Sequence, residues 1–110
     1  MITKTFMLDG DKPVIRVTFS IPSGKWTNSI YLVGDFNEWN HTSHPLLYTH
    51  EGDWIITLCL DVDKVYQFRY LCDGHEWMND CAADGYTPNQ HGSSNSLLIT
   101  QRDFASHIER

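Results

Sequence analysis

The chain has 110 residues, a length that indicates one domain with room for a core that needs no metal or disulfide. Its formal net charge of −6 at pH 7 would repel a nucleic-acid backbone and an anionic membrane surface, so we expect neither as a partner. No apolar run approaches the ~20 residues that cross a bilayer, and the N-terminus shows no apolar signal segment, so we expect a cytoplasmic protein.

The first half of the chain reads as short strands separated by turns. Alternation of apolar and polar residues predicts strands over residues 3–8 and 14–21, with a turn at Asp9-Gly10-Asp11 between them. The apolar run 30–33 predicts a third strand, and residues 46–48 predict a brief edge strand.

The loop after the third strand carries two aromatic residues. Gly34 ends the strand, and Phe36 and Trp39 follow in polar surroundings. We expect Phe36 to anchor the loop in the core while Trp39 projects into solvent, where a rigidly held indole can stack on the apolar face of a sugar or another flat ligand. The alternative is that Trp39 only covers the core.

The second half shows the clearest alternation. Residues 53–61 and 65–72 each place large apolar side chains at every second position, and Asp73-Gly74 then gives the strongest hairpin signal. The segments expected after it are a short strand over 76–78, irregular chain over 79–94, a last strand over 96–100 and a polar tail over 101–110.

The predicted fold class is all-β. No stretch has helical periodicity, and six to eight short strands in about 100 residues favour an immunoglobulin-like antiparallel β-sandwich of the early-set kind, since the Cys and Trp hallmarks of antibody domains are absent. We expect residues 1–110 to form this single domain. The predicted core contains Val17, Phe19, Val33, Phe36, Trp54, Ile56, Leu58, Phe68 and Tyr70.

The spacing of the cysteines and histidines does not indicate a metal site or a disulfide framework. Cys59, Cys72 and Cys81 are odd in number and lie in no zinc-binding spacing, which favours free thiols in a reducing compartment. The 6 histidines match no common ligand set, so we expect no metal and no cofactor.

Catalysis is not expected either. A glycosidase needs two carboxylates about 5 to 10 Å apart across a cleft, and a small sandwich has little room for one. The acidic residues Asp35 and Asp80 lie at predicted turns, where Asp favours bonds to the local backbone. We therefore interpret them as turn formers.

The order of motifs along the chain resembles a known family. It is similar to the early-set domain of isoamylases and glycogen-branching enzymes and to the glycogen-binding domain of the AMP-activated protein kinase β subunit, both of carbohydrate-binding module family 48. The resemblance covers residues 14–100 and is strongest to short free-standing bacterial members. Its motifs are LVGDFNEW (32–39), GDW (52–54), YQFRYLCDG (66–74), WMND (77–80) and GSSNSL (92–97).

The resemblance implies an α-glucan site on named positions. Trp39 and Trp77 match the two tryptophans that stack on glucose rings, and Arg69 stands where the kinase-type domains have a lysine that bonds sugar hydroxyls. In the loop before the last strand, three further positions correspond to a threonine, an asparagine and an apolar residue of those domains. They are Ser93, Asn95 and His91, respectively.

The function implied is non-catalytic binding of an α-1,4-linked glucan such as glycogen, starch, maltodextrin or cyclodextrin. The alternative is a structural or protein-docking module that associates with a glycogen-metabolising enzyme without binding sugar itself. Two exposed tryptophans with an arginine between them favour the glucan, because docking alone requires neither.

Overall fold

The computed structural model describes residues 1–22 and 27–102, and its regular structure is almost entirely β-strand. The predicted polar tail 101–110 therefore lies outside the described residues from 103 onward. Within the described ranges, no helix is long and apolar enough to span a membrane. The elements are β1 (Ile2–Asp9), β2 (Lys12–Ile21), β3 (Ile30–Gly34), the 3-10 helix η1 (Asp35–Asn37), β4 (Leu47–Tyr48), β5 (Trp54–Asp61), β6 (Val65–Cys72), β7 (Glu76–Met78), β8 (Gly85–Pro88) and β9 (Ser94–Ile99).

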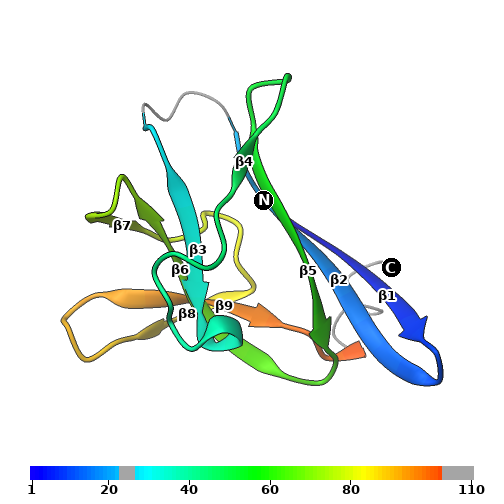
Figure 1. The fold of residues 1–110 in the computed structure, drawn as a ribbon. Coiled ribbons are helices and arrows are strands. Elements are labelled where there is room, and N and C mark those ends of the chain that lie inside the picture. The colour runs from blue at the N-terminus through cyan, green and yellow to red at the C-terminus, as the bar shows by residue number, and fades with distance from the viewer. Residues whose placement is uncertain (23–26, 103–110) are drawn as a thin grey trace.

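The strands form two antiparallel sheets, as the alternation of the sequence predicts. One sheet has the order β1-β2-β5-β4, and the other has the order β3-β6-β9-β8 with β7 added to β6. In Figure 1, β1, β2 and β5 run side by side in one layer, and β3, β6, β8 and β9 make the other. The predicted all-β sandwich is confirmed.

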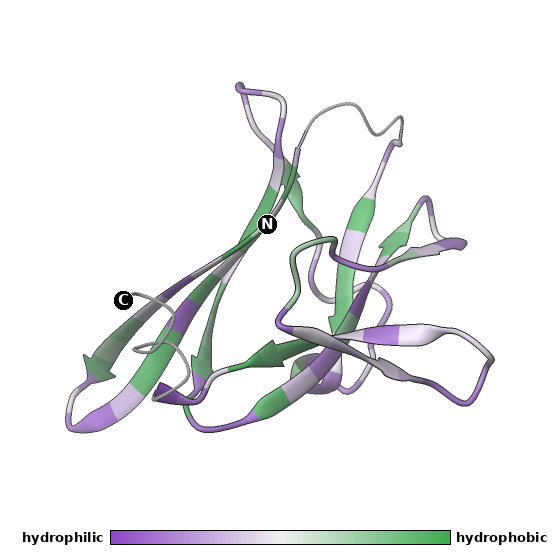
Figure 2. Cartoon of the chain, turned by 180° about the vertical axis from the view of Figure 1, so that it is seen from behind, coloured by the Kyte–Doolittle hydropathy of each residue, from purple (hydrophilic) through white to green (hydrophobic). Residues whose placement is uncertain are grey.

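The core lies between the sheets and follows the period of two. Val17 and Phe19 on β2 are fully buried, as are Phe68 and Tyr70 on β6. Figure 2 shows that apolar residues lie mainly on the strands, whereas the turns are polar. Four further predicted core residues are half-buried and pack against this cluster. They are Phe36, Trp54, Ile56 and Leu58.

Val33 is buried, but not between the sheets. The register of β3 and β6 pairs Val33 with Arg69 and Tyr31 with Leu71, so Val33 and Leu71 lie on the opposite face of the sheet from Phe68 and Tyr70. Both are nonetheless buried, at 0% and 3% exposure. The outer face of this sheet thus has an apolar base of its own, which simple alternation does not predict.

One strand falls in the segment that we expected to be irregular. Residues 79–94 contain β8 (Gly85–Pro88), which pairs with β9 at the edge of its sheet. The composition of β8 does not predict a strand, because Gly and Pro are depleted from strands. Pro88 is its last residue, where a missing backbone N–H is tolerated at an edge.

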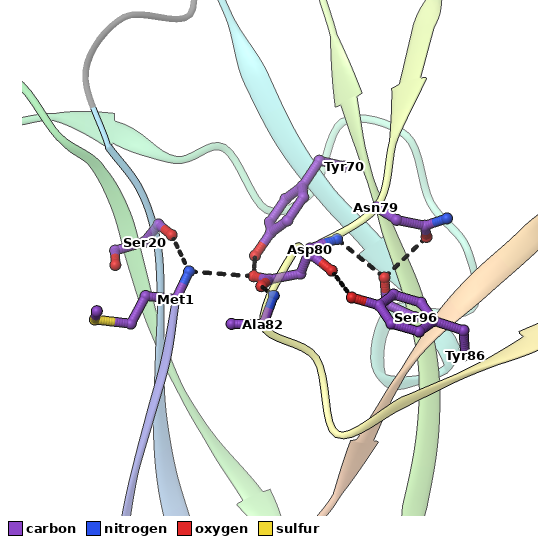
Figure 3. Close-up of polar contacts among 8 residues, drawn as sticks. All are labelled: Met1, Ser20, Tyr70, Asn79, Asp80, Ala82, Tyr86 and Ser96. Atoms are coloured by element: carbon purple, nitrogen blue, oxygen red, sulfur yellow. Dashed lines mark hydrogen bonds and ion pairs between the residues drawn. The ribbon is translucent and has the colours of Figure 1, made fainter.

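The connection from β7 to β8 is fixed by a buried carboxylate, Asp80 (Figure 3). Its Oδ2 accepts a hydrogen bond of 2.6 Å from the Tyr70 hydroxyl, and its Oδ1 accepts one of 2.7 Å from the Ala82 N–H. The Asp80 N–H donates to the Ser96 hydroxyl at 3.0 Å, and its carbonyl accepts from the Tyr86 hydroxyl. Asp80 forms the predicted turn and also joins that turn to the core.

Burial raises the pKa of Tyr70 well above its ordinary value, and the neighbouring Asp80 charge adds to this effect. The phenol therefore stays protonated and remains a donor to the carboxylate. This bond satisfies a buried charge that would otherwise be costly.

Candidate functional site

The site begins at the tight turn that follows β3. At Gly34, a Cβ atom would lie 2.5 Å from the Gln67 carbonyl oxygen and 2.7 Å from the Phe68 Cβ. Only glycine lets β3 approach β6 this closely before the chain turns. The Asn37 side chain then accepts a hydrogen bond of 3.0 Å from the Gly34 N–H and donates one of 3.0 Å to the Leu32 carbonyl, which closes the turn.

Phe36 points from this turn into the core, as predicted. Its ring centroid lies 6.0 Å from that of Phe19, 5.9 Å from that of Tyr66 and 6.4 Å from that of Phe68. These distances are typical of packed aromatic pairs. Phe36 therefore fixes the position of the loop that carries Trp39.

Trp39 is half-buried and lies at the end of this turn in an uncommon backbone conformation. Glu38 and Trp39 have φ values of +56° and +57°, in the left-handed region that non-glycine residues seldom adopt. The Trp39 N–H donates to the Gly34 carbonyl at 2.9 Å, and its indole Nε1–H donates to Asp35 Oδ1 at 2.9 Å. Among the described residues, Trp39 is not one of those packed against the core cluster.

Trp77 lies on β7, opposite Leu71 of β6, and is 37% exposed. The Arg69 guanidinium carbon lies 5.7 Å from the centroid of its ring, a cation–π arrangement. The His41 ring meets the indole in a T-shaped contact at 5.2 Å. Arg69 and Trp77 are thus in contact, and the loop that contains Trp39 and His41 reaches the same place.

The Arg69 side chain is incompletely bonded. Its Nε is buried and has no hydrogen-bond partner in the described part of the chain. Contact with the Trp77 ring offsets part of this cost, since a guanidinium is weakly hydrated and stacks well on aromatic faces.

Asn95 is only 8% exposed, and both ends of its amide are bonded to protein. Its Nδ2 donates to Gln67 Oε1 at 2.9 Å, and its Oδ1 accepts from Asn89 Nδ2 at 3.1 Å. His91 and Ser93 lie in the exposed turn between β8 and β9, and their N–H groups donate to Asn89 Oδ1 at 2.9 Å and 3.2 Å.

Arg69 and Asn95 belong to the same face of the five-stranded sheet. Phe68 pairs with Ser96 in the register of β6 and β9, so Arg69 and Asn95 are the next residues along the two strands and lie opposite the core face. The six candidate residues therefore come from the outer face of β6, from its neighbours β7 and β9, and from the two adjoining loops. The arrangement is a surface with aromatic and polar groups.

Three residues with a structural part in this surface were missed by sequence reasoning. Gln67 and Asn89 were not singled out, and Asp35 was interpreted only as a turn former. A signal for Gln67 was present, because its position on β6 shares the outward parity of Arg69. The hydrogen bonds of Gln67 to Asp35 and to Asn95 join distant segments of the chain, and Asn89 is bonded in turn to Asn95, so the sequence alone does not predict them.

A cavity of about 140 Å³ lies elsewhere, at the Asp80 end of the sandwich, and contains none of the six candidate residues. It is lined by Met1, Ser20, Ile21, Pro22, Tyr70, Met78, Asn79, Asp80 and Cys81. The Met1 nitrogen donates to the Ser20 carbonyl at 2.7 Å beside it (Figure 3). The same nitrogen lies 3.5 Å from Asp80 Oδ2, so an ion pair joins residue 1, beside β1, to the connection between β7 and β8.

Comparison with known proteins finds a short match to an enzyme. No protein-family model matches the chain. A stretch of 29 residues, 26% of the chain, is 59% identical to a 1,4-alpha-glucan-branching enzyme of Dictyostelium discoideum. The match covers 4% of that enzyme, so the chain is similar to a small part of it.

Proposed function

We propose that this protein is a non-catalytic α-glucan-binding module of the kind found in carbohydrate-binding module family 48. The observation that carries the proposal is the pairing of Trp77 and Arg69 on the outer face of the five-stranded sheet, with the Trp39 loop in contact through His41. The match to an enzyme whose name refers to 1,4-alpha-glucan supports the same class of ligand.

The residue types suit a neutral sugar chain. A glucose ring presents C–H groups on its faces and hydroxyls around its rim, so a binder needs flat aromatics for the faces and polar groups for the rim. Trp39 and Trp77 would stack on ring faces, and Arg69, His91 and Ser93 would bond hydroxyls. Because the surface is open, we expect dissociation constants on the order of 10 µM to 1 mM.

The ligand we propose is glycogen, starch, maltodextrin or cyclodextrin, without a cofactor or a metal. Binding of this strength suits attachment to a large polymer, where many sites act together. The odd number of cysteines in the sequence, Cys59, Cys72 and Cys81, supports our proposal of a reducing, cytoplasmic location.

A second candidate is a docking module for a glycogen-metabolising enzyme. The edge strand β4 favours it, because Leu47 and Tyr48 are 71% and 62% exposed on the last strand of their sheet. This surface belongs to the other sheet, so both candidates could be tested on one protein with separate variants.

Affinity electrophoresis tests the glucan proposal. The protein should migrate more slowly through a native gel that contains amylopectin than through a matched gel that contains dextran, whose glucose units have a different linkage. Retardation by both polymers or by neither would contradict the proposal and favour docking. A variant with Leu47→Ser and Tyr48→Ser should be retarded like the wild type.

A further inference from the structure

The Trp39 indole is bonded to a side chain that also reaches the neighbouring strand. Asp35 accepts the indole Nε1–H with Oδ1 at 2.9 Å, and it accepts the Gln67 backbone N–H with Oδ2 at 2.7 Å. The last ladder pair of β3 and β6 is Gly34 with Phe68, so the Gln67 N–H lies just beyond the end of β3. The Asp35 carboxylate therefore replaces the missing strand partner and holds the indole at the same time.

The side chain of Gln67 continues the chain of bonds to the second loop. Its Oε1 accepts from Asn95 Nδ2 at 2.9 Å, and Asn95 Oδ1 accepts from Asn89 Nδ2 at 3.1 Å. Asn89 Oδ1 then accepts the backbone N–H groups of His91 and Ser93. Hydrogen bonds thus run without interruption from the Trp39 indole to the turn between β8 and β9.

The backbone conformation at Trp39 is one that needs support from surrounding contacts. Two consecutive non-glycine residues, Glu38 and Trp39, lie in the left-handed region, which is costly and persists only where surrounding contacts impose it. Asp35 is exposed, so its two bonds are not needed to satisfy a buried group. They hold a strained loop in one conformation, which reduces the ordering cost when a ligand binds.

We propose that Asp35 and Gln67 are positioning residues that hold the Trp39 loop and the 89–93 turn as one preorganised binding surface. Asp35 fixes the orientation of the indole, and Gln67 connects it through Asn95 and Asn89 to the second loop. This inference rests on the proposed glucan function for its consequence, whereas the positioning itself can be measured without any ligand.

Asp35→Asn tests the first half of the arrangement. The Trp39 indole and the Gln67 N–H donate to different oxygens of the Asp35 carboxylate. In asparagine one of these oxygens is replaced by an NH2 group, which is a donor, so one of the two bonds is lost. The ¹⁵N order parameter of the Trp39 indole, assigned with Trp39→Phe, should fall from about 0.85 toward 0.6, while that of Trp77 stays unchanged. Affinity for β-cyclodextrin should fall about three- to tenfold. The control Glu38→Gln removes the same charge from the same loop. It should change neither the order parameter of the Trp39 indole nor the affinity for β-cyclodextrin.

Gln67→Met tests the second half. Methionine has a similar length but provides no strong acceptor, and the backbone bond to Asp35 remains. Exchange of the His91 and Ser93 amide hydrogens should become faster, the Trp39 indole should stay rigid, and affinity should fall about three- to tenfold. Gln101→Met, the same substitution at an exposed position outside the sheet, is the control.

A double variant separates positioning from general damage. Trp39→Phe keeps a ring but removes the indole donor, so Asp35→Asn should weaken binding little further in that background. An indole as rigid in Asp35→Asn as in the wild type, or unchanged affinity in both single variants, would overturn the inference. If the wild type binds no glucan, the proposed function fails, and a mobile Trp39 indole in Asp35→Asn would still support the positioning.

Discussion

On the inner face of β6, Phe68 and Tyr70 are fully buried, and Phe68 packs edge-on at 5.2 Å against Phe19 of the facing sheet. On the outer face of the same strand, Gln67 and Arg69 are half-buried, and each contacts a side chain from another element. The inner face is held by shape and apolar area, whereas the outer face adds directed contacts at Gln67 and Arg69 to the buried Val33 and Leu71. One strand therefore supplies stability on one side and the candidate site on the other.

The largest effect should come from a core deletion on the inner face. Phe68→Ala should lower the free energy of unfolding by about 3 to 5 kcal/mol, because it leaves a cavity between the sheets. Arg69→Ala, one residue away on the outer face, should cost less than about 1 kcal/mol, since its contact with Trp77 is partly exposed. Urea unfolding of both variants measures the difference. Equal losses would contradict the division of roles between the two faces.

A smaller loss is expected at Gly34, where the turn that carries the site approaches β6. In Gly34→Ala the added methyl group would lie 2.5 Å from a backbone oxygen, so β3 and β6 must separate. We expect a cost of about 1 to 3 kcal/mol, as for other overpacked positions. The same urea experiment measures it. If Gly34→Ala were as stable as the wild type, β3 and β6 would not be in close contact at this position.

The buried phenol of Tyr70 should make stability depend on alkaline pH. Its pKa is higher in the folded than in the unfolded chain, so above about pH 10 the unfolded chain loses a proton that the folded chain keeps. Stability that is complete below pH ~10 is therefore lost as the pH rises further. Tyr70→Phe should have a lower melting temperature at neutral pH, because Asp80 loses a donor, but a shallower decline above pH ~10. Parallel declines in the two proteins would contradict this assignment.

The difference between the inner and outer faces of the sheets also explains how much of the fold could be predicted from the sequence. The inner faces of β5 and β6 obey a period of two, so the sheets, the hairpin at Asp73-Gly74 and most of the core follow from local pattern. β8 was missed because an edge strand with Gly85 and Pro88 carries no such pattern.

The outer face could be predicted only in part. Parity places Arg69 outward, and the resemblance to a known family indicates Trp39 and Trp77. The burial of Val33 and the bonds of Gln67 depend on which segments lie beside β3 and β6, and pairings between distant segments are not encoded in local periodicity.

The most direct test of the glucan proposal is calorimetric titration of the wild type and Trp77→Ala with β-cyclodextrin, with thermal melting of both proteins. The wild type should bind with a dissociation constant between about 10 µM and 1 mM. Trp77→Ala should bind at least about tenfold more weakly and keep its melting temperature, because the ring is partly exposed outside the core. Failure of the wild type to bind at millimolar ligand, or a Trp77→Ala protein that binds normally but melts several degrees lower, would contradict the account.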